Sequence, residues 1–99
     1  MSFVTTQPEM LAAAAGSLQA IGSAMAANNS AAAGPTTGVT PAAADEVSAL
    51  TATQFATQAA MYQAISAEAA AIHQQFLATL CTSAASYTAT EAANAIAVS

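Results

Sequence analysis

The stretch Gly34-Pro35-Thr36-Thr37-Gly38-Val39-Thr40-Pro41 interrupts an otherwise alanine-rich chain of 99 residues. Its two prolines and two glycines are typical of a loop, because proline ends helices and glycine weakens them. We therefore predict a helix over about residues 8–33, a loop over about 34–40, and a second helix over about 41–83. A C-terminal tail of about 84–99 follows, and the whole chain, 1–99, forms one domain.

The first predicted helix has a start signal and one apolar stripe. Thr6-Gln7-Pro8-Glu9 fits a capping box, in which the Thr6 hydroxyl accepts from the Glu9 amide and the Glu9 carboxylate reaches back. Proline in the first turn is tolerated because its missing N–H has no partner there. The larger apolar side chains then recur at helical spacing. They are Leu11, Leu18, Ile21 and Met25.

The second predicted helix begins with Thr40 as N-cap and Pro41 at its first position. Asp45 and Glu46 follow near the N-terminus, where the helix dipole favours acids. A catalytic carboxylate pair is the alternative for these two residues. Adjacent residues on a helix diverge by about 100°, so this pair does not converge on one substrate.

The large side chains of the second helix occupy about half of its circumference. They are Val47, Leu50, Phe55, Met61, Tyr62, Ile65, Ile72, Phe76, Leu77, Leu80 and Tyr87. A single short partner helix cannot cover so wide a sector, and a two-helix hairpin has one seam and no core layer. We therefore expect an all-α fold, an antiparallel two-helix hairpin that completes a four-helix bundle with a partner. That partner is a second copy or a different helical protein.

The charge composition limits the possible partners. The chain has five acids, one His and no Lys or Arg, for a net charge of −5. Without cations it cannot neutralise phosphates, so we expect no nucleic-acid binding and no attraction to an acidic membrane surface. Polar residues break the alanine runs every few positions, so we expect no transmembrane span.

The sequence offers little to support catalysis or metal binding. Cys81 and His73 supply at most two of the four ligands that zinc needs, and a single cysteine forms no intramolecular disulfide. Both residues are interpreted as packed or interface side chains, with an intermolecular disulfide at Cys81 as the alternative. Because no phosphate loop, nucleophile elbow or ligand cluster is present, we expect no enzyme activity and no cofactor.

Several blocks together resemble the PE family of mycobacteria across essentially the whole chain. Tyr87 and Glu91 stand four apart, so they share a helix face. The other blocks are Met1-Ser2-Phe3-Val4, Pro8-Glu9, Pro35 to Val39, Ala42 to Leu50, and Ser86-Tyr87 with Thr90 to Ala93. The chain looks like a short member consisting of the PE domain alone.

The resemblance implies a partner and an export route. PE proteins pair with PPE-family proteins in a four-helix bundle and leave the cell through a type VII secretion system, and a cytosolic chaperone generally grips the PPE partner. It implies that Tyr87 and Glu91 form the secretion motif and that Pro8 and Glu9 are a structural signature. We therefore expect assembly in the cytoplasm and a final place in the cell envelope or outside the cell. A role in solute passage across the outer membrane and a self-sufficient homodimeric bundle are the alternatives.

Overall fold

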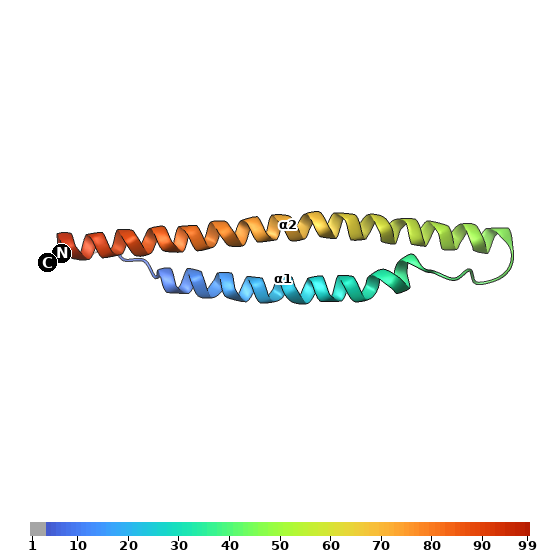
Figure 1. Ribbon diagram of the computed structural model, residues 1–99, viewed down its shortest axis with the longest axis horizontal. Helices are drawn as coiled ribbons and strands as arrows, with labels where there is room; N and C mark the ends of the chain where they lie inside the picture. Colours follow the sequence, from blue (N-terminus) through green and yellow to red (C-terminus); the bar gives the residue numbers. More distant parts are fainter. Residues whose placement is uncertain (1–3) are drawn as a thin grey trace. The chain divides into compact units, whose positions relative to one another are not determined.

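The computed structural model describes residues 4–99, and the fold is the predicted all-α hairpin. Helix α1 spans Pro8–Thr37 and helix α2 spans Glu46–Ala97 (Figure 1). No strand occurs between Val4 and Ser99. Met1, Ser2 and Phe3 belong to the domain predicted over 1–99 and lie outside the described residues.

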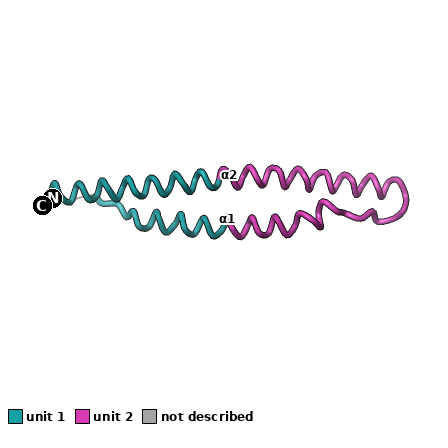
Figure 2. The backbone as a smooth tube through the Cα atoms, viewed as in Figure 1, with its two compact units in different colours: residues 1–21, 73–99 teal, residues 22–72 magenta. Residues whose placement is uncertain are grey.

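The chain divides into two compact units (Figure 2). One, called here the terminal unit, comprises the chain up to Ile21 together with His73–Ser99; the other, the loop unit, is Gly22–Ile72. In the terminal unit, Leu18 contacts His73 and Thr6 contacts Glu91, so rising numbers in one segment meet falling numbers in the other. The two helical segments of this unit are therefore antiparallel. In the loop unit, Asn29 of α1 contacts Tyr62 and Gln63 of α2.

Helix α1 begins at Pro8, and the predicted capping box is wrong. The Met10 amide donates to the Gln7 carbonyl at 3.0 Å, which makes Gln7 the residue just before the helix. Thr6 stands one position too early to cap it. The Thr6 hydroxyl donates instead to Glu91, at 2.9 Å.

Helix α1 continues past Gly34 and Pro35 to Thr37, so its predicted end near residue 33 is four residues early. Proline removes one backbone hydrogen bond from a helix interior. The two threonines after it bond the preceding turn: Thr36 Oγ1 donates to the Ala32 carbonyl at 2.6 Å and Thr37 Oγ1 to the Ala33 carbonyl at 2.7 Å. The last turn of α1 forms with the proline inside it.

Gly38 terminates α1. Its amide donates to the Gly34 carbonyl at 2.9 Å. A Cβ at position 38 would lie 3.1 Å from that same oxygen, closer than ordinary packing allows. Glycine therefore fits where the chain turns away from the helix.

Helix α2 begins at Glu46, and the predicted N-cap at Thr40 with Pro41 as first helical residue is wrong. Asp45 is the cap instead. Its carboxylate accepts from the Ser48 amide and from the Ser48 hydroxyl, each at 2.8 Å. Aspartate satisfies the first free amides of a helix more strongly than threonine does, so the loop extends over residues 38–45.

Helix α2 continues to Ala97, so the segment after Thr82, whose state the sequence leaves open, is helical up to that residue. The segment is rich in alanine and contains neither glycine nor proline, so no residue in it disfavours a helix. Thr88 and Thr90 donate their hydroxyls to the carbonyls of Ala84 and Ser86. Threonine is tolerated here because its hydroxyl bonds back to the preceding turn.

The buried core consists mainly of small side chains. Its apolar members are Ala15, Ala52, Leu77 and Ala84. Pro8 is buried as well. Alanine lets two helix backbones approach closely, but it removes little apolar area from water. Leu77 is the one large aliphatic side chain in this core, and most of the other large apolar side chains described are exposed.

Candidate functional site

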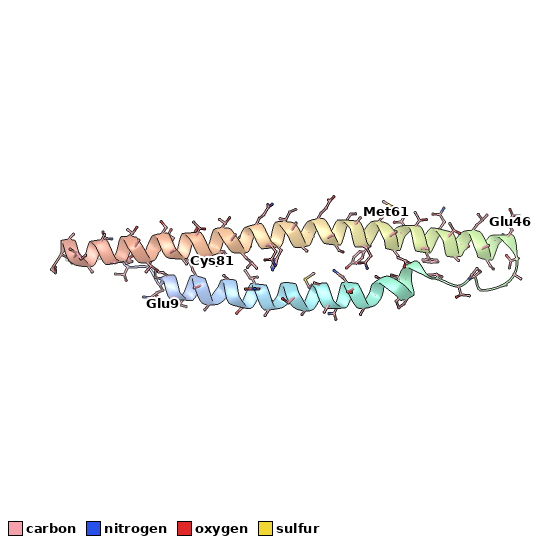
Figure 3. The ribbon with its side chains drawn as sticks, in the orientation of Figure 1. Glu9, Glu46, Met61 and Cys81 are labelled. Atoms are coloured by element: carbon pink, nitrogen blue, oxygen red, sulfur yellow. The ribbon has the colours of Figure 1, made fainter. Side chains whose placement is uncertain are left out.

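The most prominent feature of the loop unit is a group of large apolar side chains that the unit itself does not cover. We call these residues the open face: Met25, Val47, Leu50, Phe55, Met61, Tyr62, Ile65 and Ile72. Ile65 is 61% exposed and Phe55 is 63% exposed. Figure 3 shows Met61 on the side of α2 that points away from α1. All eight were predicted as interface residues, and the structure leaves them accessible to a partner.

Helix geometry explains why this face stays open. At about 100° per residue, Val47, Ile65 and Ile72 lie within about 20° of one another around α2. Ala52, which is buried, and Gln63, which bonds Asn29 in α1, lie well over 90° from that line. The side of α2 that meets α1 is therefore adjacent to the apolar stripe rather than centred on it.

The terminal unit divides its predicted interface residues into two classes. Leu11, Leu18 and Leu80 are partly covered, whereas Ile21 and Phe76 are more than half exposed. Leu77, the residue after Phe76, is buried at 6% exposure. The first class therefore belongs largely to the hairpin's own seam, and the second remains available for contact.

A groove of about 500 Å³ lies in the loop unit between the last turns of α1 and the facing part of α2. Phe55 and Tyr62 line it from α2, and Asn29, Pro35 and Val39 line it from the other side. The Tyr62 hydroxyl donates to Asn29 Oδ1 at 2.8 Å, and Gln63 Nε2 donates to the Asn29 carbonyl at 3.0 Å. The Tyr62 ring is thus held in place at the edge of the open face.

Tyr87 and Glu91, the predicted secretion motif, occupy the same face of α2 in the terminal unit but differ in their surroundings. Tyr87 is 46% exposed, and no group among residues 4–99 makes a hydrogen bond to its hydroxyl. Glu91 is half-buried, and its Oε1 accepts from both the Thr6 amide, at 3.0 Å, and the Thr6 hydroxyl, at 2.9 Å. Within residues 4–99 the phenol hydroxyl thus has no hydrogen-bond partner, whereas one oxygen of the Glu91 carboxylate is bonded to Thr6.

Pro8 and Glu9 occupy structural positions at the start of α1. Pro8 is buried at the first helical position, where its missing N–H has no partner to lose. Glu9 is exposed in the first turn, where its charge interacts favourably with the helix dipole (Figure 3). The surroundings of both are those of a helix start.

The groups capable of chemistry are dispersed. His73 Nε2 lies 2.8 Å from the Leu18 carbonyl oxygen, so it carries the proton and donates across the seam. Cys81 is exposed as a free thiol. Hydrogen bonds from the amide and hydroxyl of Ser48 hold the pKa of the Asp45 carboxyl below its usual value. Within Val4–Ser99, no three His, Cys, Asp or Glu side chains gather to hold a metal ion.

Helix α1 is long and apolar. It is 30 residues long, and its most apolar 18-residue window has a mean hydropathy of 1.4. By length and composition it could cross a membrane, contrary to our expectation. Length and composition are weak evidence for a span, because core helices of soluble proteins and signal sequences meet the same criterion.

The contacts of Glu91 with Thr6, and of Asn29 with Tyr62 and Gln63, were not predicted. Each joins residues at least 33 positions apart. A signal existed for Asn29, since an amide within an alanine-rich helix needs a polar partner when it is half-buried. No comparable signal pointed from Glu91 to Thr6.

Comparison with known proteins gives a consistent result. The sequence profile of the PE family matches residues 4–94. PE family protein PE13 of Mycobacterium tuberculosis is 69% identical over 99 residues, which is the full length of both chains. PE family protein PE8 of the same species is 55% identical over 94 residues, and PE cleavage protein A of Mycobacterium marinum is 54% identical over 92. The chain covers 34% of PE8 and 17% of PE cleavage protein A.

Proposed function

Because this chain belongs to the PE family, we propose that it is a non-enzymatic subunit of a heterodimer with a PPE-family protein. The observation that carries the proposal is the open face. Eight large apolar side chains of the loop unit face water, while the hairpin buries little more than alanine. Exposed apolar surface of this extent marks a protein interface. The PE family is known for pairing with PPE proteins, which supplies a partner of the required kind.

The pair is assembled in the cytoplasm and exported by a type VII secretion system to the cell envelope or beyond. Tyr87 and Glu91 serve as the export signal, and the chaperone contacts the complex through the PPE partner. This part of the proposal rests on family membership and on the exposure of Tyr87. A phenol that is about half exposed is free to be recognised.

Substitution of Ile65 in the open face, and of the exposed Phe76 in the terminal unit, tests the pairing. Ile65→Asp and Phe76→Asp place a charge where the partner excludes water, which should weaken pairing more than about 100-fold. Gln74→Asp is the matched control, because position 74 is exposed and lies about 180° around α2 from Ile65. Each variant is co-expressed with candidate PPE proteins, and the complex is quantified after affinity purification on the PPE chain.

Two results would contradict the heterodimer. One is a complex of Ile65→Asp that is as tight as the unmodified one. The other is a monodisperse species of doubled mass formed by the chain alone, which would favour the homodimeric bundle.

Solute passage across the outer membrane is the second candidate function. The length and apolarity of α1 favour it. Growth of a deletion strain on a panel of carbon sources distinguishes the two. A defect on particular solutes, restored by the intact gene, would identify a transport component, whereas uniform growth would leave the exported pair without this role.

A further inference from the structure

The carboxylate of Glu91 holds the segment before α1 against α2. Its Oε1 accepts from the Thr6 amide at 3.0 Å and from the Thr6 hydroxyl at 2.9 Å, across 85 positions of sequence. Both residues are half-buried. Hydrogen bonds to an ionised acceptor are about twice as strong as neutral ones, and here two converge on one oxygen.

These bonds determine where the segment Val4–Gln7 lies. Among the residues that the structure describes, no other hydrogen bond joins this segment to α2. Val4 is 95% exposed, so apolar packing of its side chain does not hold the segment. Without Glu91 the segment would therefore lose its principal attachment to the helix.

The segment is attached to α2 about one helical turn from the exposed phenol. Tyr87 precedes Glu91 by about one helical turn on the same face. A groove of about 400 Å³ opens between the segment and the end of α2, lined by Val4 and Thr5 on one side and by Glu91, Asn94 and Val98 on the other. The described contacts thus place an apolar groove and the N-terminal segment at Glu91, about one helical turn along α2 from Tyr87.

We propose that Glu91 is a positioning residue: it holds Val4–Gln7 against α2 about one helical turn from Tyr87, and the secretion machinery recognises the segment and the phenol together. The inference deepens the proposed function and rests on it. Glu91 acts through Thr6, whose amide and hydroxyl both donate to its Oε1, rather than by offering its carboxylate to the machinery.

Thr6 distinguishes the two roles of Glu91. Thr6→Val removes one of the two donors and keeps the branched shape, while Glu91→Ala removes the acceptor. If Glu91 positions the segment, each variant lowers export of the PE–PPE complex by about tenfold. The double variant should then be exported at least as well as the less exported of the two single variants, because both substitutions break the same contact. Thr90→Val is the control, because its hydroxyl bonds the Ser86 carbonyl and does not contact the segment. It should be exported normally.

Hydrogen exchange of the purified complex provides a readout independent of export. Exchange of the Thr6 amide should be about tenfold faster in Glu91→Ala than in the unmodified complex, with the melting temperature of the heterodimer unchanged. Unchanged exchange would overturn the inference, because the segment would then be held by something else.

The export results separate failure of this inference from failure of the proposed function. Normal export of Thr6→Val alongside blocked export of Glu91→Ala and Tyr87→Ala would mean that the machinery reads the carboxylate directly. Normal export of Tyr87→Ala would instead refute the export signal itself, and with it the proposed function of this site.

Discussion

Asp45 shows how a single side chain sets the start of a helix. Its two carboxylate oxygens accept from the amide and hydroxyl of Ser48, and the helix dipole adds a favourable interaction. Each of these contacts requires the ionised carboxyl. The pKa of Asp45 is consequently lower than its usual value of 3.8.

The sign of this shift predicts an acid-sensitive helix end. Because the folded pKa is lowered, the contribution of the cap is fully present above about pH 4 and is lost as the pH falls through the folded value. The amide resonance of Ser48 in the purified complex, followed by NMR, should therefore titrate with a midpoint below 3.8. Asp45→Ala should abolish this titration, and Glu46→Gln should retain it. A midpoint at or above the usual value would contradict the cap.

A second prediction at the scale of single residues concerns Tyr87 and export. Its side chain is about half exposed and its hydroxyl has no partner among residues 4–99, so Tyr87→Ala removes little that the hairpin needs. We expect the variant to pair normally with its PPE partner and to be absent from the culture medium, as judged by immunoblotting of cell and medium fractions. The control is Thr88→Val, one position along the helix. A normally secreted Tyr87→Ala would show that the signal lies elsewhere.

At the scale of the helices, polar bonds supplement a seam that alanine alone would leave weakly specified. In the terminal unit, His73 donates to a carbonyl of α1. In the loop unit, Tyr62 donates to the side-chain oxygen of Asn29, and Gln63 donates to its backbone carbonyl. Small side chains interlock less than large ones, so directional bonds help to fix which residues face each other.

The contribution of the His73 hydrogen bond to stability can be tested by replacing its donor group. His73→Leu leaves the Leu18 carbonyl without this donor and should lower the free energy of unfolding of the complex by about 1 kcal/mol. His73→Gln can still donate and should lose less. Chemical denaturation followed by circular dichroism measures both. Equal stability of the Leu variant and the unmodified complex would show that the bond adds nothing.

A second prediction at this scale concerns Pro35 and the stability of the last turn of α1. Proline in a helix interior removes a hydrogen bond and destabilises by about 3 kcal/mol, so Pro35→Ala should strengthen the last turn of α1. Amide exchange over residues 32–38 should slow by about tenfold or more. Pro41→Ala, which lies in the loop, is the control and should leave these amides unchanged. Faster exchange in Pro35→Ala would mean that the proline rigidifies the turn.

At the scale of the whole molecule, the hairpin buries too little apolar surface to be stable without a partner. Among residues 4–99, four apolar residues form its core, and three of them are alanine. Burying one large aliphatic or aromatic side chain contributes about 1.5–3 kcal/mol, and most such side chains here face water. A partner that covers the open face would supply the missing burial.

The chain purified alone should therefore be poorly folded or associated. We expect weak helicity by far-UV circular dichroism and polydisperse light scattering, both corrected by co-expression with a PPE partner. The complex prepared in parallel is the control. A sharply melting, monodisperse monomer would contradict the requirement for a partner.

Local periodicity in the sequence was sufficient to predict much of the protein. The two helices, the hairpin, the excess of apolar residues on α2 and the shared face of Tyr87 and Glu91 all follow from it, because helix geometry relates residues only a few positions apart. The helix ends were less predictable. Proline at 35 and threonine at 40 gave stronger local signals than the glycine at 38 and the aspartate cap at 45, where the helix boundaries lie.

The tertiary structure decided which side of each helix is covered. Phe76 and Leu77 are adjacent and both apolar, yet Leu77 is buried and Phe76 is half exposed, since the side of α2 that meets α1 depends on packing between helices. The bond between Glu91 and Thr6 likewise joins residues 85 positions apart. Contacts at such separations leave no periodic trace in a sequence, so the sequence established that an apolar face exists, and the fold determined which residues remain open to a partner.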